Sequence, residues 1–576
     1  CILLHLASTF SLQFPIVNTS YGSVRGYEYR TRSGFVGEIF KKIPYAAPPT
    51  GERRWEKAVP PDKWNYTLDG TFYGPACAQI PRTWEGYVTG FSEDCLTMNV
   101  YTSRRCRESN QSCPVVVYIH GGAALFGGVI TFSDEFLEEH YAKQEVVLVT
   151  INYRVGVFGM MALGDENVLP ANLGIHDILE SLRFIQKEIH NFGGDKDRVT
   201  VMGHSTGASI VVALVFSPAV NRPCEPPLFS SAIGFSSEMN FELEEKQVNA
   251  SHIVAAKLGC AGTAREIVDC LRLLSSDQIL ETALEVGGSN MFSSAHVGGI
   301  TLTGELTPIH NMKDLRQNQM KRSKQSTTFP PTRLLLGSQL NEFRIDLEYD
   351  FDFRYRVNEV LGVLNNEECV QKYASDIKAG NFPTDYDIIS QAIFMTVSLF
   401  ASAQAMAGGE VYIYQYDYPL HASHRDDLSL IMGTHAHPMD ENENWMSRVF
   451  TVYITNFIKG LPLAPDWTPL NTQLMNYYSV NKSFEDGVSP KMKYGYHQDL
   501  TDYYAEMIKF DENLTTINQK MNAPVQYKSL SLPSKVSFSF SDLIFYSTLL
   551  GLVLLMIVKV HQSCQSSRLN PNVRYV

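Results

Sequence analysis

A serine flanked by glycines stands directly after a short run that resembles a buried strand. Gly203-His204-Ser205-Thr206-Gly207 follows the β-branched run 198–202, and the apolar run 208–216 comes next. Strand, Gly-x-Ser-x-Gly and helix together are typical of a nucleophile elbow, a sharp turn that exposes the serine hydroxyl. The pentapeptide alone is a weak signal, because a tight glycine turn with an idle serine has the same pattern. The flanking strand and helix favour a catalytic serine.

A serine hydroxyl needs three kinds of partner before it can attack a carbonyl carbon. These are a histidine base, a carboxylate that orients this base, and N–H donors for the oxyanion. In an open α/β sheet such groups gather at the carboxyl ends of the strands. The turn Gly121-Gly122-Ala123, the carboxylate of Glu342 and the histidines His421 and His424 each follow a strand-like run. The chain order of serine, acid and histidine is that of the α/β-hydrolases.

Strand-like and helix-like segments alternate along most of the chain. The segment Leu173–His190 has apolar residues at helical spacing and is closed by Gly193-Gly194. Five runs are expected to be strands: 113–120, 145–151, 198–202, 333–336 and 411–416. This alternation predicts an α/β fold with a mostly parallel sheet and helices on both of its faces.

Seven stretches of the chain resemble the type-B carboxylesterases and cholinesterases. They are Ile43–Pro49, Glu93–Val100, His120–Gly122, Asn152–Gly156, Asn172–Asp177, Phe192–Asp195 and the elbow 203–207. The resemblance covers residues 17–525 and implies an α/β-hydrolase fold, with a large, mostly parallel central sheet flanked by helices and a deep gorge to the serine. It also implies hydrolysis of carboxylic esters without a metal or another cofactor.

The resemblance assigns a catalytic triad to this sequence. Ser205 matches the nucleophile, and Glu342 matches the acid, five residues after Gly337. The family has an Asp and a Gly on either side of this acid, whereas Asn341 and Phe343 stand here. An exposed turn carboxylate is the alternative interpretation of Glu342.

Four histidines compete for the role of the base. The family's histidine is followed by two residues, an acidic residue and a leucine, and His424-Arg-Asp-Asp427-Leu428 fits this pattern. His435 and His437 do not fit it, and we expect these two and His421 to be loop residues.

The resemblance also places the oxyanion hole at the N–H groups of Gly122, Ala123 and Thr206. The family usually has a third glycine where Ala123 stands, so this alanine needs either a negative φ or some strain. Thr206 replaces the usual Ala and narrows the space beside the oxyanion. His204 replaces the family's usual Glu, and we expect the loss of this negative charge to weaken any preference for cationic substrates.

Disulfides and ion pairs follow from cysteine spacing and from the resemblance. Cys77 with Cys95 and Cys260 with Cys270 are spaced as local loop closures, and the family joins both pairs; Cys106 with Cys113 is a candidate third bridge. Cys224 and Cys369 have no obvious partner by spacing, and we expect Cys564 to be free or acylated. The resemblance implies two buried ion pairs, Arg54 with Glu93 and Arg154 with Asp177. Trp84 lies where cholinesterases stack choline, but its loop is much shorter, so we expect ordinary packing.

The two ends of the chain predict a secreted and anchored protein. Residues 1–16 resemble the apolar part of a secretory signal without an initiator Met. The catalytic domain 17–525 is followed by a predicted stalk at 526–542, a transmembrane helix at 543–560 and a tail at 561–576. Lys559 and Arg568 follow the apolar run and favour a cytoplasmic tail, hence a type I orientation. A buried core helix is the alternative.

Glycosylation is expected at six Asn-x-Ser/Thr sequons, at Asn18, Asn65, Asn110, Asn249, Asn481 and Asn513. The net charge of −13 argues against nucleic acid as a partner. The sequence does not predict the oligomeric state.

The sequence thus predicts a serine hydrolase that cleaves small-molecule carboxylic esters through an acyl-enzyme on Ser205. The acyl group passes either to water or to an alcohol acceptor, and the sequence does not separate these two outcomes. A catalytically inactive, neuroligin-like adhesion protein is the alternative. It is disfavoured because an inactive relative has no reason to keep Ser205, Glu342 and His424 at their motif positions.

Overall fold

The computed structural model describes most of the chain. The described residues are 14–80, 90–109, 111–129, 132–217, 219–220, 226–238, 241–242, 244–288, 296–301, 331–343, 362–381, 388–435 and 438–522. The chain divides into two compact units, residues 1–221 with 227–515 and residues 222–226 with 516–576. In the second unit, the described residues are Pro226 and the end of the last helix, residues 516–522.

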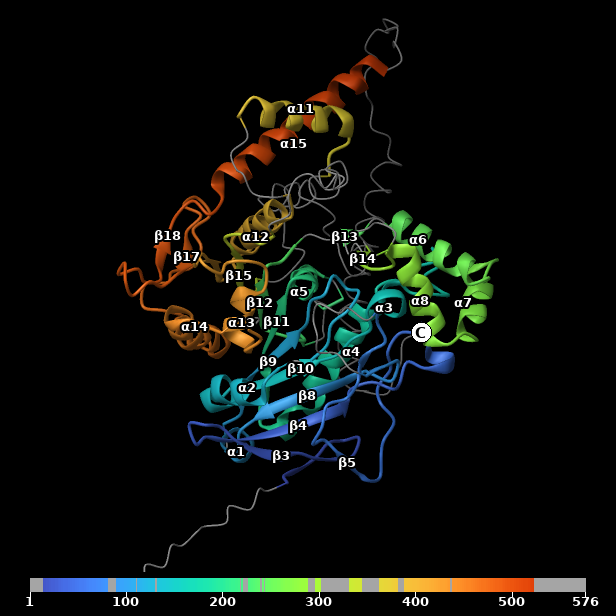
Figure 1. The fold of residues 1–576 in the computed structure, drawn as a ribbon, viewed down its shortest axis with the longest axis vertical. Coiled ribbons are helices and arrows are strands. Elements are labelled where there is room, and N and C mark those ends of the chain that lie inside the picture. Colours follow the sequence, from blue (N-terminus) through green and yellow to red (C-terminus); the bar gives the residue numbers. More distant parts are fainter. Residues whose placement is uncertain are drawn as a thin grey trace, which may run out of the picture. The chain divides into compact units, whose positions relative to one another are not determined.

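An eleven-stranded sheet forms the centre of the first unit (Figure 1). Its order is β18-β17-β16-β15-β12-β11-β9-β10-β8-β4-β3. In chain order the strands are β3 Tyr27–Arg30, β4 Val36–Pro44, β8 Thr97–Thr102, β9 Cys113–Ile119, β10 Val147–Ile151, β11 Gly194–His204, β12 Ser231–Phe235, β15 Arg333–Gln339, β16 Val411–Tyr416, β17 Tyr477–Val480 and β18 Lys491–Lys493.

The seven strands from β10 to β17 are parallel to one another, and β3, β4, β8 and β18 join the sheet in antiparallel pairs. All residues of β9, β10 and β16 are buried, as expected for strands covered on both faces. The predicted mostly parallel α/β sheet is therefore confirmed. Each of the five predicted strands is present, and the elbow strand begins earlier and ends later than expected.

Helices cover both faces of this sheet. On β9, Val115 and Val117 belong to the same core cluster as Ile178 of α4, while Val116 and Tyr118 belong to a second cluster that includes side chains of α14. This alternation is the period of two of a β-strand with a core on either side. The helices are α1 Arg104–Glu108, α2 Asp134–His140, α3 Gly156–Met160, α4 Leu173–Glu188, α5 Thr206–Phe216, α6 Glu244–Lys257, α7 Ala264–Arg272, α8 Ser276–Gly287, α11 Asn366–Lys378, α12 Ile388–Met406, α13 Asp426–Met432, α14 Glu441–Lys459 and α15 Gln498–Asn522.

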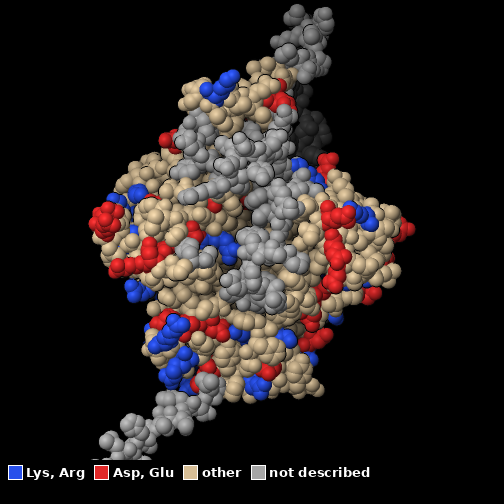
Figure 2. All heavy atoms as spheres, in the orientation of Figure 1, with Lys and Arg blue, Asp and Glu red and all other residues tan. Residues whose placement is uncertain are grey.

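Short strands complete the described part of the first unit. They are β1 Ile16–Asn18, β2 Ser23–Arg25, β5 Thr67–Asp69, β6 Ala76–Cys77, β7 Phe91–Ser92, β13 Phe241–Glu242 and β14 Ile300–Thr301. Figure 2 shows acidic side chains gathered on the side where Figure 1 places α6, α7 and α8. Exposed carboxylates on these helices include Glu244, Glu245, Asp269, Asp277 and Glu281.

One helix among the described residues, Ile389–Met406 in α12, is long and apolar enough to cross a membrane. Within that segment 78% is buried inside the protein, and α12 packs on β15 and β16. Its apolar character is therefore explained by the core. The predicted signal remnant at 1–16 lies mostly outside the described residues, and the predicted stalk, transmembrane helix and tail lie wholly outside them.

Three disulfides join the cysteine pairs discussed above. They are Cys77–Cys95, Cys106–Cys113 and Cys260–Cys270, and such bonds are typical of proteins that fold in an oxidising compartment. Cys369 is buried. Cys224 and Cys564 lie outside the described residues.

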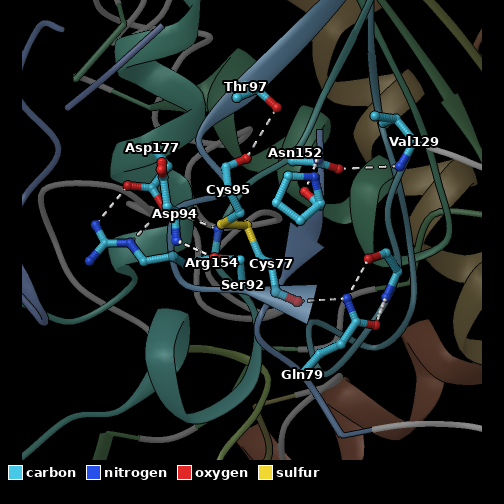
Figure 3. The surroundings of a disulfide bond; sticks show 12 residues. Cys77, Gln79, Ser92, Asp94, Cys95, Thr97, Val129, Asn152, Arg154 and Asp177 are labelled. Atoms are coloured by element: carbon cyan, nitrogen blue, oxygen red, sulfur yellow. Dashed lines mark hydrogen bonds and ion pairs between the residues drawn. A yellow bond between two sulfur atoms is a disulfide. The ribbon is translucent and has the colours of Figure 1, made fainter. Parts of the chain in front are cut away.

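Both predicted ion pairs are present. Arg54 Nε donates to Glu93 at 2.6 Å, with these side chains 10% and 12% exposed. Arg154 binds both carboxylate oxygens of the buried Asp177, at 2.8 and 2.7 Å. This second pair lies near the Cys77–Cys95 disulfide (Figure 3).

Candidate active site

The elbow serine occupies a backbone conformation that is rare for any residue but glycine. Ser205 follows the last residue of β11 and has φ 56° and ψ −129°. Both neighbouring glycines are needed for close backbone approach. A Cβ on Gly203 would lie 2.4 Å from the carbonyl of Gly207, and one on Gly207 would lie 2.2 Å from the carbonyl oxygen of Ile119. Such strain in a tightly packed turn is typical of a functional site.

The predicted acid and base meet at the ends of two neighbouring strands. Glu342 follows β15 and His424 follows β16, and β15 and β16 are paired in parallel. His424 Nδ1 lies 2.8 Å from Glu342 Oε2, and the backbone N–H of His424 donates to the carbonyl oxygen of Glu342 at 2.8 Å. The backbone N–H of Gln339 donates to Glu342 Oε1 at 2.8 Å. The Glu342 side chain is fully buried and that of His424 is 14% exposed, so Glu342 is not the exposed turn carboxylate of the alternative interpretation.

The other candidate histidines have different surroundings. His421 Nδ1 lies 2.7 Å from Glu443 Oε1, a residue of α14. His435 is half-buried and no described contact joins it to Glu342. His437 lies outside the described residues. Among the described histidines, His424 is the one that Glu342 orients.

Two of the residues that depart from the family pattern touch His424. The ring of Phe343 stacks on the His424 ring, with centroids 4.3 Å apart and planes inclined by 29°. The ring of His204 lies near it, with centroids 4.8 Å apart and planes inclined by 46°. Sequence reasoning singled out both positions but did not predict either contact, because it requires the loops after β11, β15 and β16 to be placed in space.

Asp427 is a second buried carboxylate, close enough to Glu342 to be affected by its charge. Asp427, in the first turn of α13, accepts from the Tyr414 hydroxyl at 2.5 Å and from the Gln339 side-chain amide at 2.9 Å. Burial, and then the charge of Glu342, raise the pKa of Asp427 to about 7. Sequence reasoning used Asp427 only as the acidic residue of the histidine motif.

The predicted oxyanion turn follows β9. Gly122, Ala123 and Ala124 have φ of 112°, 54° and 55°, so Ala123 adopts the strained conformation that was one of its two predicted outcomes. Among the described residues, the N–H groups of Gly122 and Ala123 have no hydrogen-bond partner, while the carbonyl of Gly122 accepts from Leu125 and Phe126. Thr206 is the first residue of α5, so its N–H has no carbonyl to bind within the helix. These three donors are therefore available to a ligand.

Gln79 holds the oxyanion turn and was not predicted. Its side chain donates to the carbonyl of Gly127 at 2.7 Å and accepts from the N–H of Gly127 at 2.8 Å. The same amide nitrogen donates to the carbonyl of Cys77 at 3.0 Å, which links the turn to the Cys77–Cys95 disulfide (Figure 3). A polar residue two positions after a disulfide cysteine is the only sequence signal for this role.

His120 contacts the backbone of the oxyanion turn at Gly121. Its Nδ1 lies 2.8 Å from the carbonyl oxygen of Gly121, and its ring stacks on Tyr153 with centroids 4.3 Å apart. Burial lowers the pKa of His120 to about 4, so this histidine is neutral at physiological pH. Burial, together with the charges of His424 and Arg425, also holds the pKa of His204 well below its usual range. His120 and His204 therefore add no positive charge to the site at physiological pH.

Trp84 was singled out from the sequence and has no described part in this site, because it lies outside the described residues. No group of three or more His, Cys, Asp or Glu side chains among the described residues has a geometry that would hold a metal ion. The arrangement supplies a partly exposed serine, an oriented histidine and N–H donors without a described partner, which are the groups that acyl transfer needs.

Known proteins resemble this chain over most of its length. A model of the carboxylesterase family matches residues 13–499. Carboxylesterase 1C of Rattus norvegicus is 28% identical over 499 residues, which cover 79% of this chain and 88% of the relative. Juvenile hormone esterase of Tribolium castaneum is 37% identical over 276 residues, 47% of this chain and 45% of that protein.

Solved structures show the same fold. A juvenile hormone esterase from Manduca sexta superimposes with a TM-score of 0.70 at 22% identity, over 86% of this chain and all of that chain. A structure titled PNB esterase gives a TM-score of 0.67 at 24% identity, over 85% of this chain. The chain therefore belongs to the carboxylesterase family, and it is a carboxylic ester hydrolase with an α/β-hydrolase fold.

Proposed function

We propose that Ser205, His424 and Glu342 perform the ester hydrolysis as a catalytic triad. His424 takes the proton of Ser205 through Nε2, because its Nδ1 is engaged by Glu342. Ser205 Oγ then attacks the carbonyl carbon of the ester, and the alcohol leaves with the proton held by His424. Water resolves the acyl-enzyme by the same proton path in reverse.

The oxyanion hole of this proposal consists of the N–H groups of Gly122, Ala123 and Thr206. A carbonyl oxygen gains negative charge in the transition state, and preorganised N–H donors stabilise that charge. The absence of any described partner for the Gly122 and Ala123 donors supports this role. Gln79 and His120 are proposed as residues that position the turn.

The observation that carries the proposal is the hydrogen bond of 2.8 Å between His424 Nδ1 and the buried Glu342. It fixes the tautomer of His424 and leaves the other ring nitrogen as a base at the end of the sheet where Ser205 stands. An adhesion protein without catalysis would not need a buried carboxylate with this partner.

Active-site labelling tests the nucleophile. We expect a fluorophosphonate to add once to the wild-type protein, at Ser205, and not to add to Ser205→Ala, as measured by intact mass and peptide mapping. Ser209→Ala is the matched control, because Ser209 lies one turn further along α5 and its hydroxyl bonds to the carbonyl of Glu238. Equal labelling of wild type and Ser205→Ala would contradict the proposed triad.

We propose small, neutral carboxylic esters as the preferred substrates. A cationic head group gains energy from a nearby carboxylate, whereas the neutral His204 stands at the position beside the nucleophile where the resemblance has a Glu. A p-nitrophenyl ester is therefore expected to have a higher kcat/KM than a thiocholine ester with the same acyl group. Preference for the thiocholine ester would mean that another group supplies a cation site. Transfer of the acyl group to an alcohol remains a second fate of the same intermediate, to be measured by adding methanol.

We propose a type I single-pass arrangement for the protein. The elements are a signal remnant at 1–16, a catalytic domain at 17–525 outside the cytoplasm, a stalk at 526–542, a transmembrane helix at 543–560 and a cytoplasmic tail at 561–576. The three disulfides support a secretory location for the catalytic domain. Expression of residues 1–525 behind a secretory signal is expected to release an active enzyme into the medium, whereas the full chain stays with the membrane fraction.

Glycosylation is proposed at the predicted sequons. Asn18, Asn65, Asn249 and Asn513 are exposed and accessible to a glycan. Asn481 is half-buried, and its side-chain nitrogen donates to the carbonyl of Asp417 at 3.0 Å, which makes it the least accessible of the described sequons. Asn110 lies outside the described residues. Peptide mass mapping before and after deglycosylation tests each position.

A further inference from the structure

His204 is a buried polar side chain with an unpaired nitrogen beside the proposed base. It is the last residue of β11, lies in register with Phe235 of β12, and is 3% exposed. Its Nε2 atom is buried and has no hydrogen-bond partner among the described residues. A buried polar group without a hydrogen-bond partner destabilises the folded protein. An unpartnered nitrogen beside the proposed base points to a small polar ligand, such as an ordered water, as its partner.

The position of His204 limits what this ligand can be. The ring centroids of His204 and His424 are 4.8 Å apart, so the two rings are neighbours and a ligand at the edge of one lies close to the other. Phe343 stacks on the His424 ring and Glu342 holds its Nδ1, so the free Nε2 of His424 is the nitrogen that exchanges protons with incoming oxygen atoms. His204 also precedes Ser205 directly in the chain. A molecule that touches both rings is therefore close to the atom that attacks or leaves the acyl group.

The chemistry of His204 suits a water molecule. The titratable or charged groups near it, His424 and Arg425, disfavour its protonation, as does its burial. A neutral imidazole has one N–H donor and one lone pair, so it can accept a hydrogen bond from water. A protonated histidine could only donate, and an aliphatic side chain could do neither.

We propose that His204 binds the water that hydrolyses the acyl-enzyme, so that it controls the second half of the reaction. The proposal rests on the proposed roles of Ser205 and His424. The water oxygen attacks the acyl carbonyl carbon while one of its protons passes to His424 Nε2. The tetrahedral adduct then breaks its bond to Ser205 Oγ, which takes this proton back as the free acid leaves. His204 accepts the second hydrogen of the water and thereby aims the oxygen lone pair at the carbonyl carbon.

The first half of the reaction does not need this contact. In acylation the nucleophile is Ser205, which the elbow backbone already fixes, whereas in deacylation the nucleophile is a mobile water molecule. Loss of the hydrogen-bonding group at position 204 should therefore slow deacylation selectively. A general disturbance of packing around His424 would slow both halves, because the same base serves both.

The test separates the two half-reactions with p-nitrophenyl acetate. Release of p-nitrophenol in the first turnover measures acylation, and intact mass of the acetylated protein over time measures deacylation. For His204→Leu we expect acylation within about threefold of wild type and deacylation slower by roughly tenfold, the scale of one lost hydrogen bond. Because kcat/KM reports acylation, it should stay near the wild-type value when kcat and KM fall together. For His204→Gln, whose amide oxygen can still accept, we expect deacylation within about threefold of wild type.

Three results would overturn the inference. They are equal slowing of acylation and deacylation in His204→Leu, unchanged deacylation in that variant, and equal slowing in the leucine and glutamine variants. If circular dichroism shows that His204→Leu is not folded, His204→Met replaces it with the same expected result. Failure of the proposed triad looks different, because the wild-type protein would then show no acetyl group on Ser205 at all.

Discussion

Glu342 and Glu138 are both buried glutamates, but the fold surrounds them differently. Glu342 receives a backbone N–H from Gln339 on one oxygen and faces His424 Nδ1 with the other. Glu138, in α2, is 0% exposed and neither of its carboxylate oxygens has a hydrogen-bond partner among the described residues. A Cβ on Gly37 of β4 would lie 1.5 Å from Glu138 Oε2, so this carboxyl group packs against bare backbone.

The difference lies in the supply of hydrogen-bond donors. Asp134 lies one helical turn before Glu138 and accepts hydrogen bonds from the hydroxyls of Tyr27 at 2.6 Å and Tyr73 at 3.0 Å. It also accepts from the Lys41 ammonium at 2.8 Å, so these donors serve Asp134 and not Glu138. Burial, and then the charges of Asp134 and Glu38, raise the pKa of Glu138 well above its usual range. Burial alone therefore does not distinguish Glu342, the proposed catalytic acid, from Glu138. What distinguishes Glu342 is that the fold supplies a partner to each of its two carboxylate oxygens and so holds them in place.

The largest expected effect in this comparison concerns the base that Glu342 orients. His424→Ala should lower kcat for a p-nitrophenyl ester by about 10³-fold or more, because among the described histidines His424 is the one that Glu342 orients. The melting temperature should change little, since His424 is the partly exposed member of the pair. His421→Ala is the matched control, because His421 pairs with Glu443 instead, and it should keep most of the activity. A larger loss of activity in His421→Ala than in His424→Ala would mean that His424 is not the base.

The next largest loss of activity is expected when one carboxylate oxygen of Glu342 is replaced by an NH₂ group. In Glu342→Gln the amide oxygen must still accept from the Gln339 N–H, so the NH₂ group faces His424 Nδ1. The histidine is then driven into the tautomer with its proton on Nε2, which cannot act as a base. We expect kcat to fall by about 10³-fold. The same exchange at Glu138 should leave kcat unchanged, and a similar loss in both variants would abolish the distinction drawn between these two carboxyl groups.

The contrast between the two carboxyl groups also marks how far the sequence could predict the site. The strands depend on local patterns, so sequence alone was sufficient for them. The elbow and the chain order of Ser205, Glu342 and His424 rest on short motifs, and the catalytic roles of these three residues stay predictions. Sequence alone was also sufficient for the disulfides Cys77–Cys95 and Cys260–Cys270, which the family resemblance implied and which close short loops.

Contacts between distant loops were beyond that reasoning. Stacking of Phe343 on His424, the hydrogen bonds of Gln79 to Gly127 and the tyrosine hydroxyls around Asp134 join segments far apart in the chain. No local pattern encodes such contacts, because they arise from the packing of the whole sheet. The sequence also did not predict the burial of Glu138, because a Glu in a short helix normally faces water.

A smaller effect is expected where a neutral side chain supports the oxyanion turn. Gln79→Leu removes both hydrogen bonds to Gly127 and so loosens the strained backbone at Ala123. We expect kcat to fall by about tenfold with little change in KM, because the oxyanion is held only in the transition state. Gln186→Leu is the matched control, since Gln186 also donates to backbone carbonyls but on α4, away from the turn. An increase in KM alone would assign Gln79 to substrate binding instead.

The smallest expected effect is a change in stability at Glu138. The pKa of this group is raised in the folded state, so its contribution to stability is present below the unfolded pKa of about 4.5 and is lost as the pH rises toward the folded value. The side chain introduced in Glu138→Gln stays neutral at every pH, so this variant does not lose stability at this position as the pH rises. At pH 8 we therefore expect the variant to melt about 2–5 °C above wild type, and at pH 4.5 we expect the two melting temperatures to converge.

The neighbour Glu139 provides the control with the opposite sign. Burial tends to raise the pKa of Glu139, but hydrogen bonds from Lys143, Ser33 and Thr31 outweigh it and lower this pKa. Its contribution to stability is therefore present above its unfolded pKa and is lost as the pH falls, so Glu139→Gln should melt slightly below wild type at pH 8. Differential scanning fluorimetry from pH 4.5 to 8 measures both variants. If Glu138→Gln were less stable than wild type at pH 8, the raised pKa of Glu138 and the contrast drawn with Glu342 would both be contradicted.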